Sequence, residues 1–515
     1  MKHFITLDDF TLEEILQIVA DSIGYIPFAW EKRFLPKKDR LYVNFKDKMA
    51  LKLIMMLEPT SRTGYSNWLG GKLNRFEVMM LAGKEALSLA KSESLADAVR
   101  THAGTQRADI LVLRTKFEGS ARFAKEILAK SGYQCAVHNA GDGANRHPTQ
   151  ALLNLTTIMH KLGRLNDFTI GFFGDLKYSR TLNSDLDALR ILNNEYRNIR
   201  VITVCAPGTG IPDYRRQGLE IEEYDSFDAF RQCDVISGIR IQQERYTDPM
   251  EKARVMGKFI LGLKILNSMK DDVVVMHPGP RGPEIDAAIS LDPRVVMWEQ
   301  MFIGVATRMA LDRWSYNLLD EKTTFDDIKP CRIEEKEKEP NEDRLKKREK
   351  EGKTDEYFRP IRRRGTIIDH ITLGLGGPIK RIMKKFNGAE GQGTVHSVEI
   401  EGRKDVIVLQ GKFPKPWFKT IIEFLNPNTT FNIIDEGWFE KQKVRISGAT
   451  MPNALTCPNP VCISRNEEEA ESSFTVCLRT SKAMCDNCMR EFTRAEIIKA
   501  TFDINVEQLE QANGE

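Results

Sequence analysis

Residues 51–71, LKLIMMLEPTSRTGYSNWLGG, contain the pattern that decides the fold of the N-terminal half. The run LKLIMML is almost entirely apolar and leads directly into the polar turn EPTSRT. The stretch that follows, NWLGGKLNRFEVMML (67–81), is compatible with a helix. A buried strand, a polar turn and a helix in this order form one unit of a parallel α/β fold.

The same pattern recurs along residues 1–315. Further apolar runs, each followed by a polar or Gly/Pro-containing turn, are ADILVLRT (108–115), QCAVHNA (134–140), FTIGFFGDL (168–176), IRVITVCAP (199–207), CDVISGIRI (233–241) and VVVMHPGP (273–280). Buried parallel strands appear in sequence as such continuous apolar runs, and there are too many here for one small sheet. We therefore expect two doubly wound parallel-sheet domains, over 1–146 and 147–295, with a closing helix at about 296–318 that belongs to the first.

The C-terminal part of the chain divides into three segments. Residues 319–355 are dominated by charges of both signs with almost no apolar periodicity, which predicts a linker containing at most a short exposed helix over DRLKKREKE. Strand-like RRRGTIIDHI and GRKDVIVLQG, with helical PIKRIMKKF and PWFKTIIEFL, predict a small α+β domain over 356–445. Residues 446–515 form a last, cysteine-containing domain.

Composition excludes several classes of protein. The 515 residues carry 76 Lys and Arg against 73 Asp and Glu, a net charge of +3, and no basic tract is interleaved with aromatic residues, so we expect no nucleic-acid partner. No apolar run approaches the roughly 20 residues of a membrane span, so we expect no membrane partner. The N-terminus MKHFITLDDF has acids and no apolar core, which argues against a signal peptide and for a cytoplasmic protein.

Two cysteine pairs predict a metal site. The motifs are CPNPVC at 457–462 and CDNC at 485–488, about twenty residues apart. Two close pairs of thiolates suit tetrahedral zinc, and four protein ligands close the coordination sphere, which makes the site structural. We therefore expect one Zn²⁺ per chain, bound by Cys457, Cys462, Cys485 and Cys488. Four free thiols in a reducing compartment are the alternative, and Cys477, between the pairs, is not expected to be a ligand.

Four polar motifs follow predicted strands. They are EPTSRT (58–63), NRHPTQ (145–150), GDLKYSRTLNS (174–184) and VMHPGPR (275–281). The hydroxyls and guanidinium of the first would meet the N-terminus of a helix, which favours a phosphate, although an ordinary helix cap with a surface arginine fits equally well. His147 in the second could donate to a developing oxyanion or could simply cap or pack. The carboxyl ends of parallel strands are where open α/β sheets bind ligands, so these motifs could converge on one cleft.

In their order along the chain, PTSRT, HPTQ, GDLKYSRT, RIQ (240–242) and HPGPR resemble the aspartate carbamoyltransferase family across 1–315. The segments RGTIIDHI and GRKD and the cysteine pairs resemble the regulatory chain of the same enzyme across about 356–500. The chain therefore looks like a catalytic chain fused to a regulatory chain. The resemblance implies a carbamoyl-phosphate domain, an aspartate domain, an α+β nucleotide-effector domain and an all-β zinc domain. HPGPR with RIQ favours the aspartate enzyme over ornithine carbamoyltransferases.

The resemblance implies a reaction and a set of residues for it. The family transfers the carbamoyl group of carbamoyl phosphate to the amine of L-aspartate, an early step of pyrimidine biosynthesis. The implied catalytic residues are Thr63, Lys91, Arg114 and His147. The implied substrate-binding residues are Thr60, Ser61, Arg62, Thr63, Lys91, Arg114, His147, Gln150, Arg180, Arg240, Gln242, Gly279 and Pro280. Lys91 matches a lysine donated to the neighbouring subunit, which implies a catalytic trimer, alone or as two trimers joined through regulatory-domain dimers.

The chain departs from the family pattern at several of these sites. Glycine stands at 279 where leucine is common, and the serine expected near Lys91 aligns with either Leu87 or Ser88. The resemblance implies a CTP or ATP effector bound by Asp369, His370, Lys404 and Lys441. A further lysine of that site is replaced by Val408, which leaves nucleotide regulation open.

Two other functions remain as alternatives at this stage. A non-catalytic assembly protein could keep the fold and the zinc domain, but it would be expected to lose anion-binding residues such as Arg114. A carbamoyltransferase for another amine would be expected to lose the pair of arginines, Arg180 and Arg240, that suits a dicarboxylate.

Overall fold

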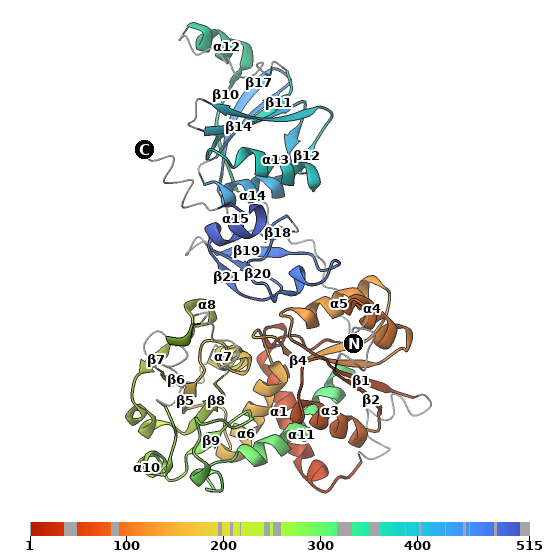
Figure 1. The fold of residues 1–515 in the computed structure, drawn as a ribbon, viewed down its shortest axis with the longest axis vertical. Coiled ribbons are helices and arrows are strands. Elements are labelled where there is room, and N and C mark those ends of the chain that lie inside the picture. The colour runs from red at the N-terminus through yellow and green to blue at the C-terminus, as the bar shows by residue number, and fades with distance from the viewer. Residues whose placement is uncertain are drawn as a thin grey trace. The chain divides into compact units, whose positions relative to one another are not determined.

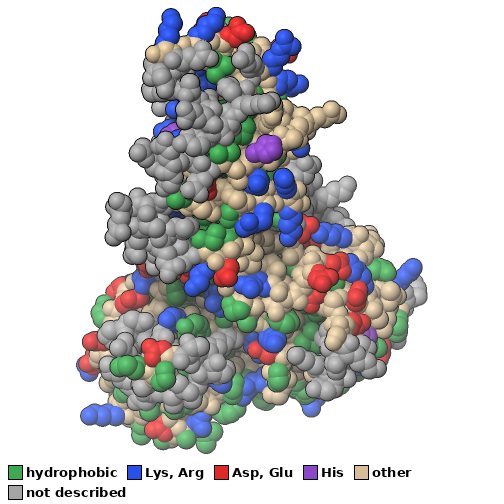
Figure 2. All heavy atoms as spheres, turned by 45° about the horizontal axis from the view of Figure 1, so that its top comes forward, with side chains coloured by type: hydrophobic (Ala, Val, Ile, Leu, Met, Phe, Trp, Pro, Cys, Tyr) green, Lys and Arg blue, Asp and Glu red, His purple; other side chains and the backbone are tan. Residues whose placement is uncertain are grey.

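The computed structural model describes residues 2–34, 49–83, 92–193, 198–205, 210–216, 218–241, 248–250, 259–316, 332–350, 361, 363–386, 388–400, 404–427, 429–445, 450–452, 454–477 and 482–504. The chain forms two compact units, Met1–Lys322 and Thr323–Glu515. Figure 1 shows the elements of each unit. On the face shown in Figure 2, acidic and basic side chains are interspersed over the first unit, as the balanced charge predicts.

The first sheet of unit 1 contains four parallel strands in the order β2-β1-β3-β4. Their bounds are β1 Leu51–Met56, β2 Glu77–Ala82, β3 Ile110–Thr115 and β4 Ala136–Asp142. The helices are α1 Leu12–Trp30, α3 Arg62–Leu73, α4 Leu95–Val99 and α5 Ser120–Lys130, with a π-helical turn at Arg100–Thr105. Every residue of β1 and β4 is buried, including Lys52 of β1 and His138, Asn139 and Asp142 of β4, so burial on both faces does not make either strand apolar along its whole length.

The second sheet contains five parallel strands in the order β7-β6-β5-β8-β9. Their bounds are β5 Phe168–Gly174, β6 Ile199–Val204, β7 Ile221–Tyr224, β8 Val235–Ile239 and β9 Val274–Met276. The accompanying helices are α6 Pro148–Leu162, α7 Arg180–Asn193, α8 Asp213–Arg216 and α10 Leu263–Leu266. Strand order reverses between β1 and β3 in the first sheet and between β5 and β8 in the second. These switch points are where doubly wound sheets bind ligands.

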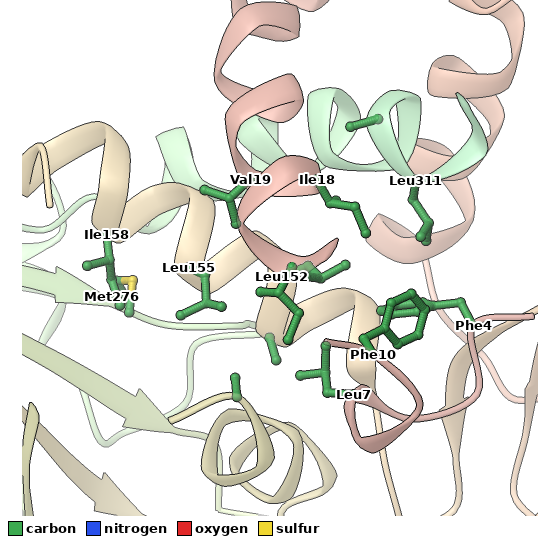
Figure 3. Close-up of a cluster of buried hydrophobic side chains, with 14 of the residues drawn as sticks. Phe4, Leu7, Phe10, Ile18, Val19, Leu152, Leu155, Ile158, Met276 and Leu311 are labelled. Atoms are coloured by element: carbon green, nitrogen blue, oxygen red, sulfur yellow. The ribbon is translucent and has the colours of Figure 1, made fainter. Parts of the chain in front are cut away.

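Helices α6 and α11 (Met297–Tyr316) join the layers of unit 1. Helix α11 packs on α1, α3 and α6, and α6 also packs on α7. Figure 3 shows the resulting apolar cluster, in which Phe4 and Phe10 from the N-terminus meet Leu152 and Leu155 of α6 and Leu311 of α11. The two parallel-sheet domains predicted from the sequence are therefore present and share one core.

Two strands of unit 1 differ from the sequence expectation. The stretch 67–81 is compatible with one helix, but in the structure α3 ends at Leu73 and β2 begins at Glu77. Arg75 takes a left-handed conformation with φ 65°, which ends a helix, and the Asn74 amide donates to the Met309 carbonyl at 3.0 Å. Strand β7 has the half-exposed sequence IEEY, so it gave no apolar signal.

Unit 2 contains a six-stranded antiparallel sheet in the order β10-β17-β16-β11-β14-β13. Its strands are β10 Arg332–Pro340, β11 Gly365–Ile371, β13 Thr394–Ile400, β14 Lys404–Gln410, β16 Thr430–Asp435 and β17 Trp438–Arg445, and a short pair joins β12 (Ala389–Glu390) to β15 (Phe413–Pro414). Helices α13 (Gly376–Lys385) and α14 (Pro416–Leu425) share a buried apolar cluster with the sheet, which includes Ile379, Ile421 and Ile407. This is the α+β domain predicted from the sequence.

Part of the charged segment predicted to be a linker has regular structure. Residues 332–340 form the edge strand β10, paired antiparallel with β17, which was not expected. Helix α12 (Asn341–Lys350) confirms the short helix expected over DRLKKREKE. Backbone pairing with β17 supplies the hydrogen bonds, so the strand needs no apolar run of its own. Charged residues are also typical of sheet edges, where they oppose aggregation.

The C-terminal part of unit 2 is a small antiparallel sheet followed by one helix. The strands, β18 Thr450–Pro452, β19 Ser473–Cys477, β20 Lys482–Cys485 and β21 Glu491–Phe492, pair in chain order, and the helix is α15 Arg494–Phe502. Thr493 and Glu496 cap α15 reciprocally. Helix α14 packs on β18 and α15, so this part shares an apolar core with the six-stranded sheet. In the described part of the chain, no helix combines the length and apolarity needed to cross a membrane.

Candidate active site

The carboxyl ends of both sheets of unit 1 border one cavity of about 800 Å³. Of the sequence-predicted substrate residues, those that line it are Thr60, Ser61, Arg62, Thr63, Arg114, His147, Gln150, Arg180, Arg240, Gly279 and Pro280. Lys91 and Gln242, with Leu87 and Ser88, lie outside the described residues. The first switch point contributes the β1–α3 turn and Arg114 on β3, and the second contributes Arg180 after β5 and Arg240 after β8.

The turn after β1 leads into the N-terminus of α3 and lines the cavity. Ser61 stands at the N-cap of α3, yet among the described residues its hydroxyl makes no capping bond to the helix. Ser61, Arg62 and Thr63 at this helix N-terminus line the cavity, and a helix N-terminus favours negative charge. Thr63 is buried, and its carbonyl accepts from Asn67 at 2.9 Å. If the turn were an ordinary helix cap, the Ser61 hydroxyl would be expected to accept a hydrogen bond from the first turn of α3, all of which is described, and it does not.

Gly279 leaves the space that Arg62 occupies. A Cβ at position 279 would lie 3.0 Å from Cζ of Arg62 and 2.9 Å from Cε of Met301. The residue also has φ +67°, and the Gly279–Pro280 peptide is cis. A leucine at position 279 would have to displace the guanidinium of Arg62. The glycine, which differs from the leucine common in the family, leaves room for Arg62 in its present position.

Glu58 joins two of the predicted arginines and was not singled out in the sequence. Its Oε2 lies 2.7 Å from Nη1 of Arg180 and 3.2 Å from Nη2 of Arg114. The same guanidinium groups donate to the carbonyls of Gly143 at 2.9 Å and Ala140 at 3.2 Å. Glu58 therefore holds both cations at the cavity and offsets part of their charge. An acid two residues before the hydroxyl turn was the signal available for it.

His147 is the N-cap residue of α6 and is kept neutral. It is 4% exposed, and its backbone N–H donates to Oγ of Ser184 at 2.8 Å. Burial, together with the charges of Arg114, Arg180 and Arg308, holds the pKa of His147 well below its ordinary value. Its Nδ1 lies 3.2 Å from Oγ1 of Thr149. A neutral imidazole has one N–H to donate, which suits it to stabilise an oxyanion.

A run of buried amides positions Gln150 and the loop after β9. The Nε2 groups of Gln150 and Gln300 donate to Oδ1 of Asn154 at 3.0 and 2.6 Å. Oε1 of Gln300 accepts the backbone N–H of His277 at 3.0 Å, at the start of the loop that contains Gly279. Sequence reasoning missed Asn154 and Gln300 because neither lies in a strand-end motif.

His277 and Glu284 form hydrogen bonds that stabilise the same loop. His277 Nδ1 accepts from the Gly279 N–H at 2.9 Å, and its Nε2 lies 2.8 Å from Oε1 of Glu284. Both side chains are fully buried. Since Nδ1 is an acceptor, Nε2 carries the hydrogen and donates to the carboxylate. The loop that presents the carbonyls of Pro278 and Gly279 is therefore held by His277 and Glu284 of its own segment as well as by Gln300 of α11.

Arg308 of α11 also lines the cavity, and no sequence motif marked it. It is buried, donates to Oγ1 of Thr149 at 3.3 Å, and donates to the Gly304 carbonyl at 3.2 Å. Burial lowers the pKa of Arg308 to about 10, so it remains charged at neutral pH. It adds a further cation to the electropositive cavity.

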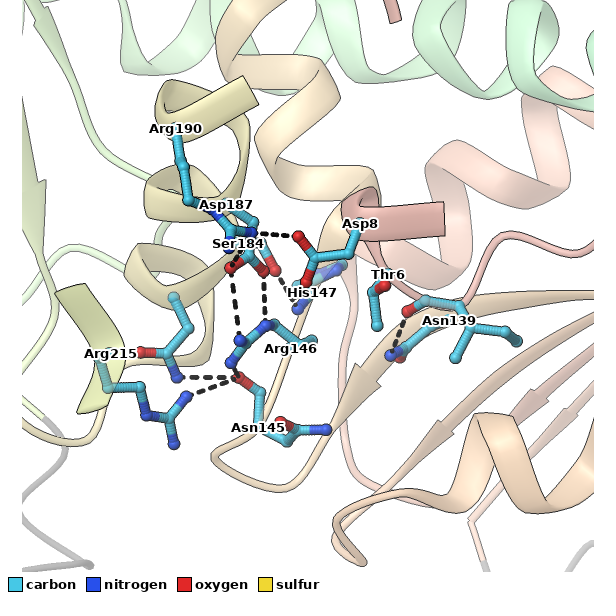
Figure 4. A network of polar contacts seen from close by, with 12 residues as sticks. Thr6, Asp8, Asn139, Asn145, Arg146, His147, Ser184, Asp187, Arg190 and Arg215 are labelled. Atoms are coloured by element: carbon cyan, nitrogen blue, oxygen red, sulfur yellow. Dashed lines mark hydrogen bonds and ion pairs between the residues drawn. The ribbon is translucent and has the colours of Figure 1, made fainter. Parts of the chain in front are cut away.

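Helix α7 is tied to the turn that carries His147 by the network in Figure 4. Nε of Arg146 lies 2.5 Å from Oδ2 of Asp187, and Arg190 pairs with Asp8. The Asn145 carbonyl accepts from Arg215 at 3.3 Å. These bonds hold the turn between β4 and α6, and thereby the backbone of His147, against the second sheet's helices.

The four predicted metal ligands of unit 2 come together. Their sulfur atoms all lie within 4.8 Å of one another, and all four residues are buried. The pairs Cys457–Cys488 and Cys462–Cys485 have sulfur separations of 3.8 Å. Tetrahedral zinc with Zn–S bonds of about 2.3 Å requires sulfur separations of roughly 3.8 Å, so the donor set fits a metal ion of this kind.

Of the predicted effector residues, Asp369, Lys404 and Lys441 lie on one face of the six-stranded sheet, and His370 follows Asp369 in β11 with φ 65°. Oδ1 of Asp369 accepts from Nζ of Lys404 and from the His370 N–H, both at 2.7 Å. Cross-strand pairing places Lys441 in the row of Ile367 and Val408, one step along the same face. Val408 is 5% exposed and packs with apolar neighbours. The position where the family has a lysine is therefore part of a small apolar cluster.

Comparison with known proteins places both units in one family. Family models for the aspartate/ornithine carbamoyltransferase carbamoyl-P binding domain and Asp/Orn binding domain match residues 2–160 and 166–314. Models for the aspartate carbamoyltransferase regulatory chain match 359–445 (allosteric domain) and 449–498 (metal binding domain). The aspartate carbamoyltransferase catalytic subunit of Methanothrix thermoacetophila is 36% identical over 318 residues, 60% of this chain and 96% of the relative.

The chain belongs to the aspartate carbamoyltransferase family.

Solved structures of the family agree with unit 1. The catalytic subunit of M. jannaschii aspartate transcarbamoylase matches with a TM-score of 0.53 and 34% identity, covering 61% of this chain and 97% of that one. The Trypanosoma cruzi enzyme, solved in complex with carbamoyl phosphate and aspartate, matches with a TM-score of 0.52 and 26% identity, covering 61% and 96%. In this member of the family, catalytic and regulatory domains are fused in one chain.

Proposed function

We propose that the chain transfers the carbamoyl group of carbamoyl phosphate to the amine of L-aspartate, giving N-carbamoyl-L-aspartate and phosphate for pyrimidine biosynthesis. The observation that carries this is the single cavity lined by Arg62 and Arg114 from one switch point and by Arg180 and Arg240 from the other. Carbamoyl phosphate and aspartate are both anions, and each pair of arginines can bind one of them. The retained arginines of the second pair suit a dicarboxylic amine donor and disfavour ornithine.

The proposed roles divide the cavity into three parts. The phosphate binds at Thr60, Ser61 and Arg62 and at the α3 N-terminus, with Lys91 supplied by a neighbouring subunit. Thr63, Arg114 and His147 face the carbamoyl oxygen. Gln150 and the carbonyls around Gly279 and Pro280 orient the carbamoyl nitrogen, while Arg180, Arg240 and Gln242 hold the two carboxylates of aspartate.

Chemistry in this site requires no covalent enzyme intermediate. The aspartate amine attacks the carbamoyl carbon, the C–O bond to phosphate breaks as the intermediate collapses, and the departing phosphate takes the amine proton. Alignment and electrostatic stabilisation of the oxyanion supply the rate. Substrate carboxylates would compete with Glu58 for Arg180. Release of that ion pair is the local rearrangement that binding demands.

His147 is proposed to donate from Nε2. Thr149 accepts a hydrogen bond from Arg308, which leaves its own hydroxyl hydrogen to point at Nδ1 of His147. An accepting Nδ1 puts the ring hydrogen on Nε2. Because the pKa of His147 is held well below its ordinary value, this form persists across the neutral range.

Phosphate release from carbamoyl phosphate tests the reaction. We expect rapid release with aspartate and at most background rates with ornithine or without acceptor. His147→Ala should lower kcat by about 10²–10³, the usual cost of removing one oxyanion donor. The factor should be equal at pH 6 and pH 9, because the imidazole is neutral at both. A pH-dependent factor would contradict the neutral donor, and equal rates with ornithine would contradict the assigned acceptor.

We also propose a catalytic trimer. Tyr65 and Trp68 of α3 and Met79 and Met80 of β2 are exposed apolar side chains at the edge of the first sheet. Strand β2 is an unpaired edge among the described residues, and it leads into the segment that contains Lys91. An exposed apolar edge of this kind favours association with another subunit.

For the metal, we propose one structural Zn²⁺ per chain. Thiolate-only, four-coordinate sites are preferred by zinc, and the four cysteines leave no open position for a substrate. Arg465 donates to the Cys457 carbonyl at 3.3 Å and so braces the first ligand loop.

For the effector, we propose a nucleotide triphosphate bound near Asp369, His370 and Lys404, with weak affinity because Val408 provides no cation. Isothermal titration with CTP and with ATP should give dissociation constants weakened by roughly tenfold or more relative to a site with the extra lysine. Val408→Lys should tighten binding, and Lys404→Ala should abolish it. Titration heats unchanged in Lys404→Ala would place the nucleotide elsewhere.

A further inference from the structure

The buried carboxyl group of Asp185, on α7, is linked by hydrogen bonds through Asn154 to the amides that border the cavity. Nδ2 of Asn154 donates to Oδ1 of Asp185 at 2.8 Å, and Oδ1 of Asn154 accepts from both Gln150 and Gln300. Asp185 is 5% exposed, Asn154 3%, Gln150 7% and Gln300 1%. Of these side chains, Gln150 and Gln300 line the cavity. The chain of bonds therefore runs from buried α7 to the cavity wall.

The direction of the hydrogen bonds in this network is fixed by the backbone N–H of His277. The carbonyl of Asn154 accepts from Gln150 and Gln300, and its NH₂ donates to Oδ1 of Asp185. At the other end, the backbone N–H of His277 can only donate, so Gln300 turns its carbonyl to His277 and its NH₂ to Asn154. Burial raises the pKa of Asp185 to about 8, and Asp187 lies nearby. A protonated Asp185 still offers its other oxygen as an acceptor.

The direction of these hydrogen bonds decides which end of the Gln150 amide is available to a ligand in the cavity. Its NH₂ is engaged by Asn154, which leaves Oε1 as the available end of the amide. Among the described residues, no hydrogen bond to this oxygen is formed. An acceptor at this position attracts an N–H donor on a bound ligand and gains nothing from a methyl group.

We propose that Asn154, held by Asp185, is a positioning residue that turns the Gln150 carbonyl toward the carbamoyl nitrogen and so makes the site select an amide over a methyl ketone. This proposal rests on the proposed function, because it concerns how the carbamoyl-phosphate site distinguishes an amide from a methyl ketone. Asn154 itself does not touch the substrate.

Two competitive inhibitors that differ in one group test the proposal on the full chain. Phosphonoacetamide carries the NH₂, and phosphonoacetone carries a methyl group in its place. We expect the unchanged protein to favour the amide by at least tenfold in Ki. Asn154→Leu should reduce that preference to within about threefold and leave the Ki of inorganic phosphate unchanged. Retention of the tenfold preference in Asn154→Leu would overturn the proposal.

Matched variants separate positioning from general damage. Leu186→Ala removes a buried neighbour of Asp185 and should lower stability while keeping the inhibitor ratio. The exchange Asn154→Asp with Asp185→Asn restores an acceptor for Gln150 at constant size and charge, so it should keep the tenfold ratio, and loss of the ratio there would also overturn the proposal. This second variant keeps the test decisive where Asn154→Leu does not fold.

Binding of the inhibitors and of inorganic phosphate separates a failure of the proposed reaction from a failure of the positioning role of Asn154. Failure of both inhibitors and of inorganic phosphate to bind the unchanged protein would contradict the proposed function. Equal, measurable binding of amide and ketone by the unchanged protein would leave the phosphate site intact and contradict the positioning role alone.

Discussion

Arg62→Ala is expected to lower kcat/KM for carbamoyl phosphate by about 10³ or more, since it removes a charge-assisted, bidentate contact to the group that departs. The guanidinium lies at the N-terminus of α3, against Gly279, on the cavity wall. A phosphate bound there gains charge as the C–O bond breaks, so the contact strengthens toward the transition state. The loss should therefore appear in kcat as well as in KM, measured by phosphate release over a range of carbamoyl phosphate concentrations.

Three further variants control this result. Arg62→Lys keeps the charge without the planar fork and should recover only part of the activity. Gly279→Ala should reproduce the defect, because the added Cβ would meet the guanidinium of Arg62. Arg33→Ala removes an exposed arginine paired with Glu31 on the same unit and should leave the kinetics unchanged. Full activity of Arg62→Ala would exclude the turn as the phosphate site.

Loss of the metal is expected to unfold the C-terminal part of unit 2. Structural zinc sites contribute about 10–16 kcal/mol in small domains, more than a domain of this size gains from its core alone. Cys485→Ser, or treatment with a strong chelator, should remove one equivalent of zinc. Limited proteolysis should then cut within residues 446–515, while metal-loaded protein resists. Metal content is measured by atomic emission on the purified chain.

The matched control is Cys477→Ser, the cysteine between the two pairs. It should retain one equivalent of zinc and the protease resistance of the unchanged protein. The zinc assignment would fail if Cys485→Ser kept its metal, or if the purified chain held another metal in stoichiometric amount.

The parallel-sheet core was predictable because strands buried on both faces are mostly apolar, and the buried charge of Lys52 in β1 is paired with Asp312. Strand β2 was not predictable, since its exposed positions carry methionines that continue the periodicity of α3, and the break depends on the left-handed Arg75. Strand β10 was missed for a different reason. It is held by backbone pairing with β17, which a charged sequence does not reveal.

The cavity was predictable where it is built from strand ends, as with Arg62, Arg114 and Arg180. The residues that helices α6 and α11 contribute to the cavity and its surroundings were not predictable from local motifs. Arg308 lies nearly two hundred residues after Arg114, and Asn154 faces the core side of α6, so neither belongs to a local motif. Lys91 and Gln242 stay predictions.

The shared core of unit 2 has a thermodynamic consequence. Apolar residues of the effector sheet, of α14 and of the cysteine-bearing sheet pack in one continuous cluster, so the folded forms of the two parts favour one another. Any ligand that binds only the folded form then raises the apparent affinity of the other, by the same factor in each direction. Nucleotide would retard zinc loss, and zinc would tighten nucleotide binding, through mutual stabilisation alone and without any change of shape at either site.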